Sequence, residues 1–484
     1  TRPVSVAGFP APDGKTILDM ERLEGYTILA EEAKARLASL LPGIRPEDFA
    51  ARNPNEKTGA MLFPRKSLET IGRLLFPYVS FGVLNGGSAT SYCDSKKNEA
   101  LSAALFRLLQ KPFLESAAFA RGKPKGITPA YANPDHSPGY SFLELKLRSL
   151  LLEAKNWRAL SARYPGVYAA GGLSPFAPVF QMTSIFTNRE IGEALALYRK
   201  SPLLEGLIAE TGIDISRVET GVQPLIAAFT HSSAGEHKEI FTRAWGKEDT
   251  VLGLPGGHGQ NFIVLKDVYR RLRKAGKRFV YLGNVDNIGF APDPASLAIL
   301  ALSGRPAGFD FAFKTAVDTK GGVLVRDAGG KLTCADIGAA VSAADVTAAE
   351  KAGTPILFNA ATGLFDLDYL VTHIEEIRDG IPLRWSDQNK DAGSYSQAEQ
   401  VTWEIIGILP SPLIFGINKF RRFLAAKLLL ESLMTSGLGL ESPDFPGELR
   451  ELAKSLHEGF IWNMENICGM KRDNGGKQWS IFPH

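Results

Sequence analysis

Hydrophobic positions follow two different spacings along the chain. Between residues 17 and 42, apolar side chains recur about every 3.6 residues, which predicts a helix. From about residue 78, short apolar runs alternate with amphipathic stretches, the pattern of strand–helix units around a mainly parallel sheet. The expected strands are residues 79–84, 178–182, 278–285, 309–317 and 322–332, the last turning as a hairpin at 328–330. The expected helices are residues 98–109, 189–198, 261–275, 423–434 and 446–467.

The alternation of strands and helices ends near residue 385, where the chain becomes polar and then helical. We therefore expect an α/β fold with a mixed, mainly parallel sheet in residues 76–385. A helical N-terminal segment (1–75) and a small helical C-terminal domain (386–484) would flank it. The length of 484 residues is compatible with this division, because typical domains have about 100–150 residues.

Composition excludes several classes of protein. The 55 basic and 52 acidic residues are scattered, so we expect no nucleic-acid partner. Cys93, Cys334 and Cys468 show no metal-binding spacing, which favours a reducing compartment. We see neither a signal-peptide pattern nor a run near the roughly 18 apolar residues that span a bilayer. The expectation is a cytoplasmic protein without a membrane partner.

Three glycine- or asparagine-rich motifs lie near expected strand ends. FGVLNGGSATSYCDSKKN (81–98) ends a strand, turns at Gly86-Gly87 and precedes a helix, as in loops that bind phosphate; a tight turn with solvated lysines explains it equally well. LPGGHGQNF (254–262) surrounds His258 with glycines, although a lone His is more often structural. YLGNVDNIG (281–289) puts Asp286 after a strand, either as a Mg²⁺ ligand or as a loop cap.

Taken in order, these motifs resemble the UTP–glucose-1-phosphate uridylyltransferase family and its UDP-sugar pyrophosphorylase relatives. That family runs LNGG-small-GT…PK, P-hydrophobic-x-x-M-x-S-x-x-T, a strand with Gln, PPGHGD, NIDNLG, KT-x-AD-x-KGG, FNTNN and RFLPVK. The counterparts here, spanning roughly residues 78–430, are LNGGSAT…KK, PVFQMTSIFTN, VQPLIAAF, PGGHGQ, NVDNIG, KTAVDTKGG, FNAATG and RFLAAK.

The resemblance implies a Rossmann-like nucleotidyltransferase that joins UTP to a sugar 1-phosphate and releases pyrophosphate, with Mg²⁺ as cofactor. Glucose 1-phosphate would be the first candidate sugar. The oligomeric state stays open. The resemblance implies these roles: Leu84, Asn85, Gly86, Gly87, Gln223, Gly257, His258 and Asn284 at the nucleotide; Asn287, Gly322 and Asn359 at the sugar; Lys97, Lys314 and Lys427 at the phosphates; and Asp286 at the metal.

The chain departs from the family pattern at several positions. Ala89 stands where the family has its second loop glycine, which would cost about 1–2 kcal/mol if that position needs a positive φ. The glycine loop is one residue shorter before its lysine than in the family, so either Lys96 or Lys97 could be the lysine that meets the phosphates. Gln260 replaces an acidic residue, and FNAATG lacks two amides. A UDP-N-acetylglucosamine pyrophosphorylase and a non-catalytic UDP-sugar-binding relative therefore remain alternatives, with a purely structural α/β protein behind them.

Overall fold

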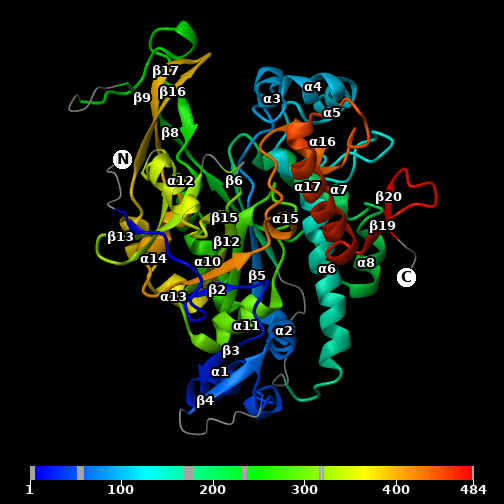
Figure 1. Ribbon diagram of the computed structural model, residues 1–484, viewed down its shortest axis with the longest axis vertical. Coiled ribbons are helices and arrows are strands. Elements are labelled where there is room, and N and C mark those ends of the chain that lie inside the picture. The colour runs from blue at the N-terminus through cyan, green and yellow to red at the C-terminus, as the bar shows by residue number, and fades with distance from the viewer. Residues whose placement is uncertain are drawn as a thin grey trace.

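The computed structural model describes residues 6–51, 59–167, 178–231, 237–315, 318, 321–338 and 340–481. Its centre is an 11-stranded sheet of order β2-β18-β12-β15-β11-β5-β6-β7, with β13 paired to β15 and joined to β14 and β1 (Figure 1). Along the main path all neighbours are parallel except β15, which is antiparallel to β11 and β12. The strands are β1 (Val6–Gly8), β2 (Ile17–Asp19), β5 (Val79–Leu84), β6 (Val179–Ser184), β7 (Glu219–Gln223), β11 (Phe279–Asn284), β12 (Ala307–Phe313), β13 (Gly322–Asp327), β14 (Leu332–Asp336), β15 (Leu357–Asp366) and β18 (Leu413–Ile417).

Both faces of the sheet are covered, which explains why its central strands are buried along almost their whole length and are mostly apolar. Phe81 and Tyr281 belong to one hydrophobic cluster, and Val280 and Leu282 to the other, as the alternation of side chains along a strand requires. The first face is covered by α1 (Ala30–Leu40), α2 (Arg65–Leu74), α6 (Phe142–Ser161), α7 (Asn188–Tyr198), α8 (Glu205–Thr211), α11 (Pro294–Ser303) and α17 (Gly447–Asn466). The second is covered by α9 (Asn261–Val264), α10 (Lys266–Lys274), α13 (Leu367–Thr372), α14 (Ile374–Gly380) and the 3₁₀ turn η7 (Thr402–Gly407). The predicted α/β class with a mixed, mainly parallel sheet is confirmed.

Smaller units extend from the sheet. An arm at the upper left of Figure 1 contains the β16–β17 hairpin and the short strands β8 and β9, while α3, α4 and α5 gather with α16 at the upper right. These helices share one hydrophobic cluster that is separate from both faces of the sheet. The remaining elements are β3 (Gly25–Leu29), β4 (Ala60–Pro64), β8 (Leu225–Ala227), β9 (Phe229–Thr230), β10 (Gly253–Pro255), β16 (Arg384–Lys390), β17 (Gly393–Glu399), β19 (Met470–Arg472), β20 (Trp479–Ile481), α3 (Ser95–Leu101), α4 (Ala103–Leu108), α5 (Gln110–Ala120), α12 (Ala343–Lys351), α15 (Lys419–Arg422), α16 (Leu429–Thr435), and the 3₁₀ turns η1 (Pro46–Asp48), η3 (Phe76–Tyr78), η4 (Lys125–Ile127), η5 (Ala244–Gly246) and η6 (His258–Gln260).

The predicted helix over residues 17–42 is wrong in its first half. Ile17 and Leu18 are fully buried in β2, which pairs with β18 at the sheet edge, and the helix begins only at Ala30. The predicted helix over 423–434 also begins late, at Leu429, because the Leu424 N–H is bonded to the Asn287 side chain in extended chain. Tertiary pairing overrides the local pattern in both places. Residue 317, at the end of one predicted strand, lies outside the described residues.

The central sheet also bears on the expected division of the chain. It includes β2, from the segment before residue 76, and β18, from the segment after residue 385. The three-unit division stays a prediction. Within the described part of the chain, no helix combines the length and apolarity needed to cross a bilayer.

One close packing contact makes a stability prediction. A Cβ on Gly72 of α2 would lie 1.8 Å from the carbonyl oxygen of Pro294, at the start of α11. We expect Gly72→Ala to lower the unfolding free energy by about 1–3 kcal/mol, because the two helix backbones must separate. The measurement is thermal unfolding. The matched control is Gly192→Ala in α7, where a Cβ meets no atom within 4 Å; it should be neutral or stabilising by up to about 1 kcal/mol. Equal midpoints for the two variants would refute the α2–α11 contact.

Candidate functional site

The carboxyl ends of β5, β6, β7 and β11 meet at one edge of the sheet. In the parallel register of β5 with β11, Leu84 lies opposite Asn284. The backbone N–H of Val285 donates to the Leu84 carbonyl at 3.3 Å. The loop after β5 and the loop that carries Asp286 therefore leave the sheet side by side, where α/β proteins bind ligands.

The loop after β5 has a buried base and an open tip. Leu84 and Asn85 are buried, and the Asn85 amide donates to the Gln181 side chain at 3.1 Å. The Asn85 side-chain oxygen is buried without a hydrogen-bond partner among the described residues. Gly87 is exposed, and a Cβ there would meet nothing within 4 Å. Gly86 and Gly87 can therefore approach a ligand, whereas Leu84 and Asn85 support them from below.

Ala89 does not strain this loop. It is absent from the non-glycine residues that have a positive φ in the described chain. Its side chain is fully buried, and its N–H donates to the Lys123 carbonyl at 2.9 Å. The cost expected for replacing the family's glycine is therefore not incurred here.

Lys125 connects this loop to Asp286. The Lys125 ammonium lies 2.6 Å from Asp286 Oδ2, donates to the Ala426 carbonyl, and stands 4.8 Å from the centre of the Tyr92 ring. Its backbone N–H donates to the Gly87 carbonyl at 3.0 Å. Both charged side chains are mostly buried, at 12% and 18% exposure. Lys125 thus joins the glycine loop through its backbone N–H, and the Asp286 loop and the segment before Lys427 through its ammonium.

Lys97 does not make this contact. It lies exposed on α3, and its ammonium donates to the Ser91 hydroxyl at 3.0 Å. The helices α3 to α5 separate the glycine loop from Pro124-Lys125, a Pro-Lys dipeptide of the kind that the family pattern has after that loop. The sequence placed Lys97 at the phosphates, with Lys96 as its alternative, and that role stays a prediction; Lys125 was not among the predicted residues.

Lys427 follows directly on the carbonyl that Lys125 binds. Its side chain is exposed, and its backbone N–H donates to Glu431 at 2.8 Å. Glu431 also accepts the N–H of Leu428 at the start of α16. Among the described residues, the exposed Lys427 ammonium has no hydrogen-bond or ion-pair partner, one residue from the carbonyl that Lys125 binds.

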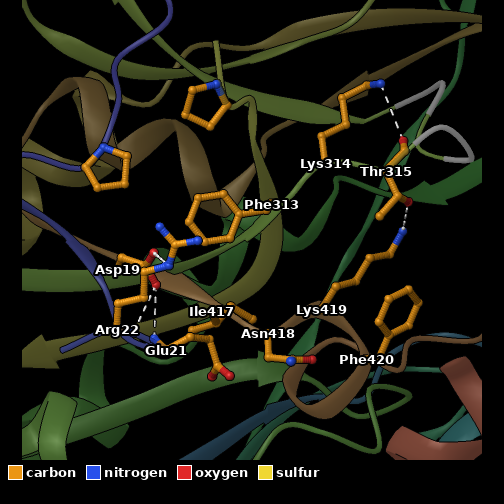
Figure 2. A pocket seen from close by; sticks show the side chains of 12 residues that line it. Asp19, Glu21, Arg22, Phe313, Lys314, Thr315, Ile417, Asn418, Lys419 and Phe420 are labelled. Atoms are coloured by element: carbon orange, nitrogen blue, oxygen red, sulfur yellow. Dashed lines mark hydrogen bonds and ion pairs between the residues drawn. The ribbon is translucent and has the colours of Figure 1, made fainter. Parts of the chain in front are cut away.

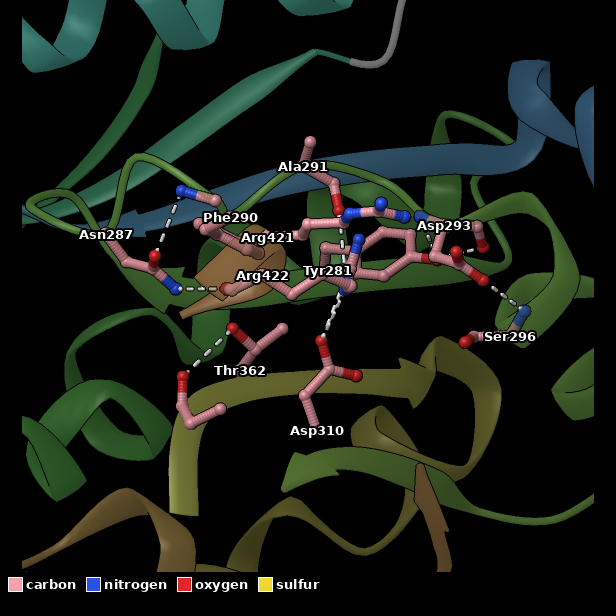
Figure 3. Close-up of polar contacts among 12 residues, drawn as sticks. Tyr281, Asn287, Phe290, Ala291, Asp293, Ser296, Asp310, Thr362, Arg421 and Arg422 are labelled. Carbon is pink, nitrogen blue, oxygen red and sulfur yellow. Dashed lines mark hydrogen bonds and ion pairs between the residues drawn. The ribbon is translucent and has the colours of Figure 1, made fainter. Parts of the chain in front are cut away.

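Asn287 holds the Asp286 loop against the RFLAAK segment instead of facing open space. It is fully buried; its side-chain oxygen accepts the N–H groups of Gly289 and Leu424, and its amide donates to the Arg422 carbonyl. The structure thus gives Asn287 a supporting position, which differs from the sugar contact that the resemblance implies. Figure 3 shows Asn287 beside the Arg422 backbone.

Arg422 anchors the same segment from beneath. Its guanidinium donates to Asp310 on β12 at 2.8 Å and to the Ala291 carbonyl at 3.2 Å (Figure 3). Burial works against the charge of Arg422, but the attraction of Asp310 and Asp293, together with the hydrogen bond to Asp310, outweighs it. The pKa of Arg422 therefore lies above its ordinary value. Arg422 is therefore a mostly buried ion-pair partner of Asp310, with 16% of its side chain exposed.

A Gln-lined wall stands at the end of β7. The Gln223 amide donates to the Gly257 carbonyl at 2.7 Å and to the Gln260 side chain at 3.0 Å. Its side-chain oxygen faces Gly86, 3.6 Å from where a Cβ would be. Gly257 has φ +82°, and a Cβ there would lie 2.4 Å from the Gln400 carbonyl oxygen. This glycine is therefore required by backbone packing, and Gln223 leaves an acceptor toward the loop.

His258 is held in a defined orientation. Its Nδ1 accepts the backbone N–H of Thr402 at 3.1 Å, and its ring lies 5.9 Å from that of Trp403. Because Nδ1 accepts, the neutral ring carries its proton on Nε2. Burial lowers the pKa of His258 to about 4. At neutral pH this residue is a hydrogen-bond donor and not a cation.

A second polar cluster lies at the start of β13. A Cβ on Gly322 would lie 3.5 Å from Asn359 Cβ and 3.4 Å from Asp336 Oδ1. Gly322 and Asn359, to which the resemblance gives one role at the sugar, therefore lie close together, and Asp336 lies beside them. Arg384 donates to Asp336 at 2.5 Å and also pairs with Glu404. The sequence analysis did not identify Asp336, because its place beside Gly322 follows only from the pairing of the two residues in the β13–β14 hairpin.

Lys314 lies elsewhere along the edge. Its ammonium pairs with Glu350 at 2.8 Å, and its side chain is 8% exposed. Together with Lys419 and Thr315 it lines one side of a cavity of about 680 Å³, with Asp19 and Arg22 opposite (Figure 2). The Lys314 ammonium is therefore paired with a carboxylate, whereas within the described ranges the Lys427 ammonium pairs with none.

The residues present fit a Mg²⁺ ion bound mainly by phosphate and water. Mg²⁺ needs only one or two protein carboxylates in such sites. Asp286 supplies one at the strand edge beside the open glycine loop. Within the described ranges, no group of three or more His, Cys, Asp or Glu side chains could hold a metal by itself.

Comparison with known proteins agrees with this geometry. The model of the family described as UTP–glucose-1-phosphate uridylyltransferase matches residues 233–427, which include the Asp286 loop and RFLAAK. The match begins after the glycine loop and the helices α3 to α5. No curated protein matches the chain. The resemblance found in the sequence motifs is confirmed.

Two solved structures share the fold. One is a mutant of the UDP-glucose pyrophosphorylase of Leishmania major in complex with UDP-glucose (17% identity, TM-score 0.50), covering 74% of this chain and 64% of that one. The other is the uridine diphosphate N-acetylglucosamine pyrophosphorylase of Trypanosoma brucei in complex with an inhibitor (14% identity, TM-score 0.55), covering 83% and 80%. This chain thus spans less than two thirds of the Leishmania protein.

The environment of His258 predicts a pH dependence of stability. The folded pKa of about 4 lies below the ordinary value of 6.5, so the unfolded chain binds the proton more readily. This residue should therefore cost stability as pH falls from about 6.5 towards 4. We expect His258→Asn to reduce that slope in thermal unfolding, with His373→Asn, a histidine remote on α13–α14, as control. Identical slopes in wild type and His258→Asn would contradict the assignment.

Proposed function

We propose that this protein is a uridylyltransferase that makes a UDP-sugar and pyrophosphate from UTP and a sugar 1-phosphate. The observation that carries the proposal is the meeting of Lys125, Asp286 and the segment before Lys427 beside an open glycine loop. We take glucose 1-phosphate as the first acceptor, because the matching family model is that of the glucose enzyme. N-acetylglucosamine 1-phosphate is the second, since a fold neighbour is named for that sugar.

Uracil would lie between Gly86 and Gln223. Both hydrogens of the Gln223 amide are used within the protein, so its free group is the side-chain oxygen facing the loop. That oxygen can accept the N3–H of uracil, whereas N3 of cytosine is itself an acceptor and would be repelled. The geometry therefore supports UTP over CTP.

The chemistry is one substitution at phosphorus. An oxygen of the sugar phosphate attacks the α-phosphorus of UTP in line, the α–β bridging P–O bond breaks, and its electrons leave with pyrophosphate. Both reactants are anions, so alignment and charge neutralisation decide the rate. Lys125 would hold phosphate oxygens beside the glycine loop, and the exposed Lys427 would meet the incoming phosphate. No general base is needed, because the attacking phosphate is already ionised at neutral pH.

Asp286 would hold Mg²⁺, which lowers the repulsion between the phosphates when bound. In the structure Lys125 neutralises Asp286 instead. When substrate binds, this ion pair would therefore be replaced by two others: Asp286 would pair with Mg²⁺, and Lys125 would pair with a phosphate group. The sugar would extend towards Gly322 and Asn359, where Asp336 offers an acceptor for hydroxyl groups.

The test is pyrophosphate release from UTP over a panel of sugar 1-phosphates, with product identified by mass. We expect pyrophosphate release with the 1-phosphate of at least one hexose whose sugar ring carries no charge of its own. Binding of UDP-sugar without release would favour the non-catalytic alternative. Absence of both would overturn the proposal.

Asp286→Asn should abolish pyrophosphate release in a variant that still folds, although its thermal midpoint should fall because Lys125 loses its mostly buried partner. The amide removes the charge that Mg²⁺ and Lys125 require but keeps the size of the side chain. The matched control is Asp368→Asn, whose carboxylate pairs with Arg273 and Arg278 near the opposite end of β11. Turnover by Asp286→Asn within about threefold of the control would exclude Asp286 as the metal ligand.

UTP should be preferred over CTP and ATP by about a hundredfold in kcat/KM, because a mismatched base leaves buried polar groups unpaired. Gln223→Ala should narrow the gap to CTP. The specificity constants with one good sugar 1-phosphate measure this. The control is Gln181→Ala, which removes the glutamine one strand inward that supports Asn85; it should lower all three constants alike. Equal use of CTP by the wild type would refute the uracil site.

A further inference from the structure

The loop that carries Asp286 is held from behind by a buried lysine that the sequence motifs do not include. Lys146 lies on α6 and is 3% exposed. Its ammonium donates to the carbonyl of Asn287, to that of Ile288 at 3.1 Å and to that of Phe290 at 2.7 Å. It also lies 5.4 Å from the centre of the Phe290 ring. Three ammonium hydrogens thus meet three carbonyl oxygens of one short loop.

This arrangement is costly, so it needs a compensating interaction. An ammonium removed from water is strongly destabilised unless its hydrogens find partners. Burial lowers the pKa of Lys146 to about 7; the attraction of Cys468 and Asp286 opposes that shift, and the nearby charge of Arg422 adds to it. The three carbonyls would in turn lose this partner if the ammonium were removed.

The position of Lys146 relative to the site makes this contact specific. Asn287, Ile288 and Phe290 follow closely on Asp286 in the chain, and Asn287 also binds the RFLAAK segment through its side chain. Lys125 binds the Asp286 carboxylate from the front. The loop is therefore held between two ammonium groups, one on its carboxylate and one on its carbonyls.

We propose that Lys146 is a positioning residue whose ammonium fixes the loop of residues 286–290 and thereby presents Asp286 to the metal and phosphates. It touches no substrate and acts through the loop backbone. The proposal rests on the proposed function for the role of Asp286. Its structural part, the fixing of the loop, can be tested without turnover.

The matched control is a second buried lysine at the other end of β11. Lys277 precedes β11 at its amino end, is 6% exposed, and its ammonium donates to the Pro77 carbonyl at 2.7 Å. Lys146 acts just beyond the carboxyl end of β11. Lys146→Met and Lys277→Met therefore remove the same charge from the two ends of one strand, and both should lower the thermal midpoint.

Amide hydrogen exchange is the first measurement. In Lys146→Met, the amides of residues 285–290 should exchange at least about tenfold faster than in wild type, because local opening of the loop becomes easier. Lys277→Met should leave them unchanged. If Lys146→Met does not fold, Lys146→Arg decides: a planar guanidinium cannot match the three carbonyls, so the loop should still exchange faster. Unchanged loop exchange in the folded variant would overturn the proposal.

Metal binding is the second measurement. Mn²⁺ titrated with UDP, followed by electron paramagnetic resonance, should bind about ten- to a hundredfold more weakly to Lys146→Met, as expected when support of a ligand is lost. kcat should fall while KM for UTP changes little. Equal Mn²⁺ affinities for the Lys146 and Lys277 variants would overturn the positioning role.

The two proposals fail in different ways. If wild type binds Mn²⁺ with UDP and Lys146→Met loses that affinity, but wild type releases no pyrophosphate with any sugar 1-phosphate, the proposed function is refuted and the positioning role stands. If wild type releases pyrophosphate and both lysine variants keep their Mn²⁺ affinity and loop exchange, the proposed function stands and the positioning role is refuted.

Discussion

The ion pair of Lys125 with Asp286 is the contact on which the rest of the site depends. It joins three segments that are far apart in sequence: the loop after β5, the loop after β11 and the segment before Lys427. Each segment has its own support, with Asn85 under the first, Lys146 and Asn287 behind the second and Arg422–Asp310 beneath the third. These supports are hydrogen-bonded within the protein, and the Lys125–Asp286 pair that they surround is itself mostly buried. In the proposed function, these supports hold in place the one contact that a ligand would exchange.

The sequence predicted what depends on short-range pattern. The strand 79–84 was identified with its correct bounds, and Gly86, Gln223, Asp286 and the Gly322–Asn359 contact lie along one sheet edge as the motifs implied. What it could not supply depends on packing between distant residues. Ile17 fits the helical spacing of the apolar residues that follow it, but it is buried together with Leu18 in an edge strand. In the sequence, Lys146 and Arg422 look like solvated charges, because their partners lie on other elements. Lys125 could not be linked to the glycine loop, because the helices α3 to α5 separate the two in the sequence.

Those helices are more than an interruption of the glycine loop. Their entry and exit are tied together, since Ala89 bonds to Lys123 and Ser88 pairs with Pro124. Their apolar side chains pack with α16, and the Tyr92 hydroxyl bonds to Ser432 at 2.6 Å. The Asn98 side chain accepts the N–H of Leu430. The helices α3 to α5 thus form one hydrophobic unit with α16, the helix that follows Lys427. The segment that carries Lys125 and the segment that carries Lys427 are therefore held together by this unit as well as by their contact at the sheet.

The pairing of β2 with β18 has a consequence for how the chain acquires its structure. These neighbours lie near opposite ends of the sequence, and β18 also bonds to β12. During synthesis on the ribosome, the β12 edge therefore stays unpaired until residues 413–417 emerge, and an unpaired edge invites association with other chains. Pairing β2 with β18 closes a loop of most of the chain, and such long-range pairing is slow. Lys427 follows shortly after β18, so completion of the sheet and arrival of the last charged group of the site become nearly the same event.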